Sequence, residues 1–106
     1  MSIEIEEYLN ERGESAYFKW ITKLNAVAQV KIVTAVRRIA KGNSSNMKHI
    51  GAGVWELTID FGPGYRVYCG KDGPILIILL NGGSKKRQQN DIDKAKSYWK
   101  DYKKRK

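Results

Sequence analysis

The stretch "VWELTIDFGPGYRVYCGKDGPILIILL", residues 54–80, decides the fold. It contains three β-rich segments, at 54–60, 65–69 and 74–80. The sequences between them, "FGPGY" and "GKDG", are typical of tight turns. Three such segments in close succession predict an antiparallel meander. Its longest apolar run, "ILIILL", is too short to cross a membrane and is typical of a buried strand.

The residues before the meander predict a strand followed by two helices. "SIEIEEYL", residues 2–9, alternates apolar and acidic side chains, as a strand with one wet face does. Ser15 is a candidate N-cap for the helix in "SAYFKWITKL", and Asn25 is a break or cap before a second helix. That second helix, over 26–41, carries one apolar stripe and ends at Gly42. We therefore expect two antiparallel helices joined by a short turn.

The residues after the meander predict a loop and a last helix. "NGGSKKRQQN", residues 81–90, is typical of a loop, Asn90 is a candidate helix cap, and Asp93 stands at the capping-box position. The basic tail at 103–106 is expected to fray. The chain thus predicts one α+β domain over 1–106, with an antiparallel sheet that has helices on one side.

The charge of the chain favours a polyanionic partner. Twenty Lys and Arg against eleven Asp and Glu give a net charge of +9 and a pI near 9.7. Residues 1–14 carry a net charge of −4 and residues 85–106 a net charge of +7. Nucleic acid is the commonest partner of such a surface, and a solvated basic surface kept for solubility is the alternative.

Composition excludes several kinds of site. A single cysteine, Cys69, and a single histidine, His49, leave no zinc cluster and no internal disulfide, which favours a reducing cytosol. "GAGVWE" at 51–56 opens a strand instead of a helix, so it is no phosphate loop. The N-terminus lacks a signal-peptide pattern. We expect no metal and no other cofactor.

A permanent cation, Arg66, stands inside the central β-rich segment. Alternation places Arg66 and Tyr68 on one face of that strand and the apolar residues beside them on the other. If the apolar face meets the helices, Arg66 and Tyr68 point onto an open, concave side of the sheet. The alternative is an ion pair between Arg66 and an acidic residue of the neighbouring strand, Glu56 or Asp60.

Further cations flank the meander. Lys48 precedes it, and Lys85, Lys86 and Arg87 follow it. The ends of the strands can bring these groups to one rim of the sheet, where with the tyrosines they form a basic pocket suited to RNA backbone and bases. A solvated basic loop is the alternative interpretation of the run at 85–87.

Three stretches resemble the RelE/ParE superfamily of toxins, in the phage-derived, HigB-like "addiction module killer protein" branch. They are "VWELTID" followed by "GPGYRVYCG", then "ILIILLNGGSKKRQQNDIDKAKSYWKDY", and the helical pattern of "YFKWITKL…VKIVTAVRRIAKGN". The resemblance spans nearly the whole chain. It departs from the family at Thr58, where relatives often have an arginine. It implies a curved antiparallel sheet with an N-terminal helical hairpin and a C-terminal helix.

The resemblance also implies the toxin of a type II toxin–antitoxin system, and many such toxins are metal-independent endoribonucleases that cleave mRNA on the ribosome. The strand arginine of those relatives matches Arg66, and Lys48 and Lys85 lie in comparable regions. Clustered positive charge favours the neutral form of a lysine, so Lys48 or Lys85 is a candidate base, and His49 is the alternative. The expected RNA-binding residues are Lys86, Arg87, Tyr68 and His49.

Two other functions stay open from the sequence. The ParE branch inhibits DNA gyrase without cleaving RNA, and an inactive nucleic-acid-binding relative is the third possibility. For both toxin functions, mRNA cleavage and gyrase inhibition, the resemblance implies a cognate antitoxin that forms a hetero-oligomer with the chain in the cytoplasm. Trp20 is the candidate antitoxin contact, with a place in the core as the alternative.

Overall fold

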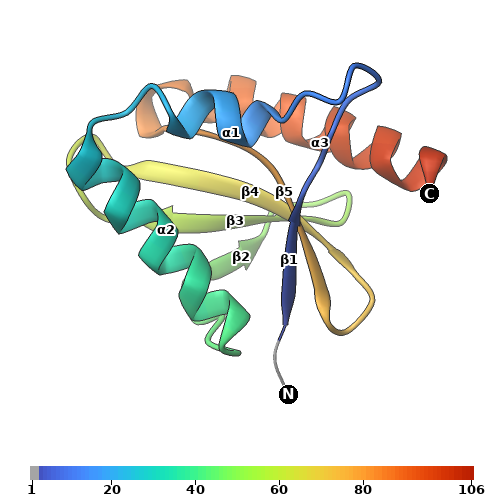
Figure 1. Ribbon diagram of the computed structural model, residues 1–106, viewed down its shortest axis with the longest axis horizontal. Helices are drawn as coiled ribbons and strands as arrows, with labels where there is room; N and C mark the ends of the chain where they lie inside the picture. The colour runs from blue at the N-terminus through green and yellow to red at the C-terminus, as the bar shows by residue number, and fades with distance from the viewer. Residues whose placement is uncertain (1–2) are drawn as a thin grey trace.

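The computed structural model describes residues 3–106 and has an α+β fold (Figure 1). This confirms the predicted fold class. In chain order its elements are β1 (Glu4–Glu7), α1 (Ala16–Ile21), α2 (Ala26–Ala40), β2 (Met47–His49), β3 (Val54–Ile59), β4 (Tyr65–Asp72), β5 (Leu76–Ser84), the 3₁₀-helix η1 (Lys85–Arg87) and α3 (Gln88–Arg105).

The five strands form one sheet in the order β1-β5-β4-β3-β2. The predicted meander is its antiparallel centre, and the turns between strands use Gly62, Gly64 and Gly73 at positive φ. β1 adds to the edge of β5 in parallel, so the sheet is mixed. Figure 1 shows α1 and α2 diverging from the short turn that joins them.

Helices cover both faces of the sheet. The helices α1 and α2 pack on one face, where Ile32 and Ile39 belong to the same buried core as Val67 and Cys69 of β4. Burial raises the pKa of the Cys69 thiol to about 12, which agrees with a packing role. The helix α3 packs on the other face. The expectation of helices on one side only is therefore wrong.

Two glycines make room for α3. A Cβ atom built at Gly70 would lie 2.3 Å from Cε3 of Trp99, and one built at Gly53 would lie 2.7 Å from its Nε1. The Trp99 ring therefore rests directly on the backbone of β4 and of the turn that leads into β3. Around it Tyr68, Ile78 and other buried residues form a second core.

The predicted helix starts are confirmed at two of three places. Ser15 Oγ accepts a hydrogen bond from the Phe18 N–H (3.0 Å), and Asn25 Oδ1 accepts one from the Ala28 N–H (2.9 Å). The predicted Asn90 cap is wrong, because β5 runs on through Ser84 and passes through η1 directly into α3 at Gln88.

The end of α3 is held by charge pairs. The helix continues through Arg105, in the stretch for which the sequence favours fraying. Lys106 Nζ lies 2.6 Å from Asp72 Oδ1, and Arg105 Nη2 lies 2.7 Å from Asp101 Oδ2. These pairs account for an ordered last turn in a strongly basic segment.

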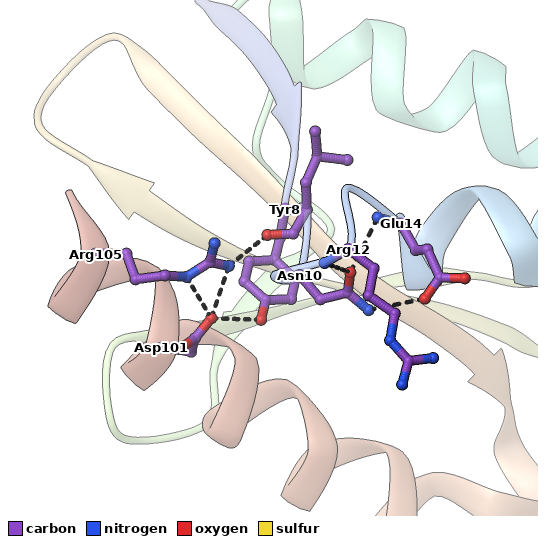
Figure 2. A network of polar contacts seen from close by, with 7 residues as sticks. Tyr8, Asn10, Arg12, Glu14, Asp101 and Arg105 are labelled. Atoms are coloured by element: carbon purple, nitrogen blue, oxygen red, sulfur yellow. Dashed lines mark hydrogen bonds and ion pairs between the residues drawn. The ribbon is translucent and has the colours of Figure 1, made fainter.

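A polar network ties α3 to the loop between β1 and α1 (Figure 2). The Tyr8 hydroxyl donates to Asp101 Oδ2 (2.6 Å), Arg105 Nε donates to the same oxygen (2.8 Å), and the Arg105 guanidinium also donates to the Leu9 carbonyl. These bonds lower the pKa of Asp101. Asn10 Oδ1 accepts two backbone N–H groups of the loop and shapes it. The start of α1 and the end of α3 are thus fixed relative to each other.

Candidate functional site

The three predicted catalytic cations lie on one face of the sheet, at one end. Lys48 stands directly across from Glu56, which pairs with Tyr68 of the core beneath α3, and Arg66 alternates with Tyr68 along β4. The side chains of Lys48, Glu56 and Arg66 therefore point to the face that α3 covers. Lys85 reaches the same place from η1. A Cβ atom built at Gly64 would lie 3.5 Å from Lys85 Cβ and 4.0 Å from Arg66 Nη1.

Glu56 is the centre of this cationic cluster. Its side chain is 5% exposed, and its Oε1 lies 3.6 Å from Arg66 Nε. Its Oε2 accepts a hydrogen bond of 2.8 Å from Gln88 Nε2, at the first residue of α3. The ion pair weighed as the alternative for Arg66 is therefore present, and it explains how a β-strand accommodates a cation that is almost buried.

Gln88 is the residue of this site that sequence reasoning missed. The polar run at 81–90 is typical of a loop by composition, and that interpretation gives Gln88 no defined position. The available signal was general: 3₁₀ turns are frequent at helix N-termini, so polar residues directly before a helical pattern can already belong to the helical segment. In the structure Gln88 joins the start of α3 to the centre of the cluster.

Tyr68 does not face an open surface. Its side chain is fully buried beneath α3, and burial raises the pKa of its hydroxyl. A buried ring cannot stack on an RNA base, so the expected base-stacking role of Tyr68 is wrong. The reason is that α3 occupies the face that the sequence left open.

His49 lies on the opposite face from Lys48, since neighbouring residues of a strand alternate. Its ring centroid is 5.1 Å from that of Trp55, which packs against the α1–α2 core. Lys71 Nζ lies over the other ring, 3.8 Å from the Trp55 centroid. His49 is thus separated from Arg66 by the sheet, so it is not placed to act as the alternative base beside Arg66, and its role in RNA binding stays a prediction.

The residues of the run Lys85-Lys86-Arg87 diverge. Successive side chains of a 3₁₀-helix point about a third of a turn apart, so the three cannot share one direction. Lys85 packs beside Gly64, Lys86 is exposed, and Arg87 lines a groove beside α1. Only Lys85 of the three joins the Arg66 cluster.

Trp20 is half-buried and packs on β5. A Cβ atom built at Gly82 would lie 2.2 Å from Trp20 Cζ3, and the Trp20 and Tyr65 rings meet edge to face at 6.2 Å. This agrees with the packing alternative for Trp20, although part of its ring stays accessible. The most exposed apolar side chains of the two helices are instead Phe18, Val27 and Val30.

Residues 3–106 contain neither a group of metal ligands nor a helix that could cross a membrane. No group of three or more acidic, histidine or cysteine side chains there could hold a metal ion. No helix in that range is both long enough and apolar enough to cross a membrane.

The family model "Phage derived protein Gp49-like" matches residues 19–100, which include the whole Arg66 cluster. The chain belongs to the Gp49-like family. This family is toxin-like and related to the RelE/ParE superfamily. The Gp49-like chain is also 39% identical over 97 residues to an uncharacterized protein of Haemophilus influenzae, an alignment that covers 91% of this chain and 92% of the relative.

Proposed function

We propose that this Gp49-like protein is the toxin of a type II toxin–antitoxin pair and arrests translation by cleaving mRNA without a metal ion. The observation that carries the proposal is the position of Arg66, Lys48 and Lys85 on one face of the sheet, with Arg66 ion-paired to the buried Glu56 carboxylate. Three cations on one face, one of them oriented by a carboxylate, are suited to a phosphodiester.

In the proposed reaction the RNA supplies its own nucleophile. The 2′-oxygen attacks the adjacent phosphorus and the bond to the 5′-oxygen breaks, which leaves a 2′,3′-cyclic phosphate and a 5′-hydroxyl. Arg66 binds the phosphate oxygens, on which negative charge grows. One of the two exposed lysines, Lys48 or Lys85, accepts the 2′-hydroxyl proton, and the other donates a proton to the leaving 5′-oxygen.

Glu56 and Gln88 act as positioning residues in this scheme. Gln88 fixes the Glu56 carboxylate with a hydrogen bond, and Glu56 attracts the Arg66 side chain from one side. The Arg66 side chain is 13% exposed, so it has little freedom to turn away. A cation fixed in advance costs less reorganisation when the phosphate binds.

The experiment compares mRNA cleavage and translation arrest by the wild-type chain with those by the Arg66→Lys and Arg66→Ala variants. Arg66→Lys keeps the charge and the partner of Glu56 but loses the planar fork that binds two phosphate oxygens. We expect each variant to lose mRNA cleavage, measured by primer extension on a ribosome-bound message. Arg12→Ala is the matched control, because Arg12 lies in the β1–α1 loop and only its backbone N–H donates a hydrogen bond. Full cleavage by Arg66→Lys and Arg66→Ala would refute the proposal.

Two alternatives are gyrase inhibition and loss of activity in this chain. They are distinguished from mRNA cleavage by which process stops first when expression of the chain is induced. Labelled precursors show translation falling first for a nuclease and replication falling first for a gyrase inhibitor. No effect on either would indicate an inactive relative.

The proposed partner is an antitoxin with an acidic, amphipathic segment. The net charge of +9 favours an acidic partner, and the exposed Phe18, Val27 and Val30 on α1 and α2 favour apolar contact. Trp20, beside them on α1, stays a proposed contact of that segment through its accessible edge.

A further inference from the structure

A groove of about 500 Å³ lies between α1 and the first half of α3. Its floor is the end of β5, from Asn81 to Ser84, beyond the point at which β1 stops pairing with β5 at Leu79. None of Arg66, Lys48 and Lys85 lines it. The groove is therefore a second concave surface, next to the proposed cleavage site but built from other residues, and its volume suits a small ligand.

Two residues that line the groove, Asn81 and Asp91, each carry a buried hydrogen-bond acceptor without a donor. Asn81 Oδ1 and Asp91 Oδ2 are buried and have no hydrogen-bond partner among residues 3–106. The Asn81 amide nitrogen donates to the Asp91 carbonyl (3.1 Å), which leaves Oδ1 as the free atom. A buried acceptor without a partner is costly, so these two atoms favour a ligand that brings N–H donors.

The carboxylate of Asp91 is placed there by a glycine. A Cβ atom built at Gly83 would lie 1.8 Å from Asp91 Oδ2, so any larger residue at position 83 would displace it. Gly82 plays the same part for Trp20. The two consecutive glycines of β5 thus let an aromatic ring and a carboxylate approach the strand from α1 and α3.

The walls and rim of the groove have a different character from the floor. Trp20, Tyr65 and Tyr98 supply aromatic surface along the walls. Exposed cations stand around the opening, namely Lys19, Lys23, Arg87 and Lys94. Lys19 is paired with Glu14 at 2.8 Å, and the other three make no ion pair with residues 3–106.

We propose that this groove binds one nucleotide of a single-stranded RNA, with its base inward and its phosphates at the cationic rim. The groove requires a ligand with hydrogen-bond donors at its inner end, a flat face for the aromatic walls and negative charge at its outer end. A nucleotide has these groups in this order, because its base is flat and carries donors and its phosphate is anionic. Guanine fits best, because its N1–H and its 2-amino group are adjacent donors for two acceptors. This inference rests on the proposed function, because the bound RNA is the substrate proposed for cleavage. It assigns a preference for guanine in that RNA to Asn81 and Asp91.

The test is a titration of the full-length chain with each ribonucleoside 5′-monophosphate and with inorganic phosphate, followed by amide and indole NMR shifts. We expect GMP to shift the amides of Gly82 and Gly83 and the indole of Trp20. UMP carries one donor and binds about tenfold more weakly, as expected for a lost hydrogen bond to a charged group. Inorganic phosphate produces no shift at the floor.

Variants separate the floor from the rim. Asp91→Ala should lower GMP affinity about tenfold and abolish the preference over UMP. Lys94→Glu should weaken all four nucleotides alike, because it acts on the phosphate. Lys100→Glu, an exposed position of α3 outside the groove, is the matched control and should change nothing.

Three results would overturn the inference. Equal affinity for GMP, UMP and inorganic phosphate would reduce the groove to an anion site, and absence of shifts at millimolar nucleotide would remove it. Tighter binding of an acidic peptide at the same residues would assign the groove to a protein partner. The proposed cleavage is tested separately through Arg66, so nucleotide binding without translation arrest would contradict that function and leave the groove standing.

Discussion

Arg66 Nε lies 3.6 Å from Glu56 Oε1, and both side chains are almost withdrawn from solvent. The two residues stand diagonally on neighbouring strands, since Arg66 faces Thr58 and Glu56 faces Tyr68 across the β3–β4 ladder. The pair therefore serves the fold by neutralising two buried charges, and in the proposed mechanism it also aims the cation. The two roles can be separated by measurement.

A double-mutant cycle on this pair measures its coupling. Glu56→Gln leaves the Arg66 charge without a counter-charge and should lower the free energy of unfolding by about 1–3 kcal/mol. Arg66→Gln leaves Glu56 unpaired and should cost a similar amount. The double variant should be less destabilised than the sum of the two, as measured by urea unfolding. Strict additivity would contradict a direct interaction.

The meander and the N-caps of α1 and α2 followed from local patterns, because alternation, turn glycines and cap side chains act over a few residues. The long-range features did not. Asn-Gly-Gly-Ser at 81–84 is loop-like by composition, yet Trp20 and Asp91 require glycine there, so the strand continues. That requirement comes from α1 and α3, which are distant in sequence.

One missed feature of the site had a signal in the sequence. The unbroken apolar run at 75–80 is typical of a strand buried on both faces, which indicates helices on both sides of the sheet. With α3 placed on the second face, Tyr68 would have been expected in a core. Likewise, a strand at 47–49 would have separated Lys48 from His49 by alternation.

Gly70→Ala tests the seat of α3. The new methyl group would overlap the Trp99 ring, which must move with its helix, so we expect a loss of about 1–3 kcal/mol in stability and a changed near-UV circular dichroism signal. Gly42→Ala is the comparison, because nothing lies within 4 Å there and only its φ of +93° opposes alanine. A signal unchanged from wild type in Gly70→Ala would contradict the packing of Trp99 on β4.

Asp91 should make the protein less stable as pH rises. Burial raises the pKa of Asp91 above its ordinary value of 3.8, so the folded chain holds this proton more tightly than the unfolded chain does. The contribution of the protonated Asp91 side chain to the free energy of unfolding is fully present below pH 3.8 and is lost as pH rises through the raised pKa. Asp91→Asn should remove this loss and raise the melting temperature at pH 7.

The comparison is made at two pH values. Asp101 and Asp72 have lowered pKa values and act in the opposite direction, because their contribution is lost as pH falls. The informative quantity is therefore the difference between Asp91→Asn and wild type at pH 7, relative to the same difference near pH 4. An Asp91→Asn variant that is less stable than wild type at pH 7 would show that the Asp91 charge does not destabilise the folded chain.

Two exposed valines of α2 belong to the surface that we propose the antitoxin covers. Val27 and Val30 lie three residues apart on α2 and are 58% and 64% exposed, so they contribute little to the fold of the free chain and share one side of the helix. Val30→Glu should leave the melting temperature within a few degrees of wild type. It should weaken binding of an acidic, amphipathic segment, because it removes apolar area and adds a like charge. Thr34→Glu, another exposed position of α2, is the matched control for the added charge.

The measurement is co-expression with the product of the neighbouring reading frame, followed by co-purification in moderate salt and by a growth assay. We expect wild type and Thr34→Glu to be captured and neutralised, and Val30→Glu to escape and arrest growth. Capture of Val30→Glu as complete as that of wild type would place the antitoxin on another face of the molecule.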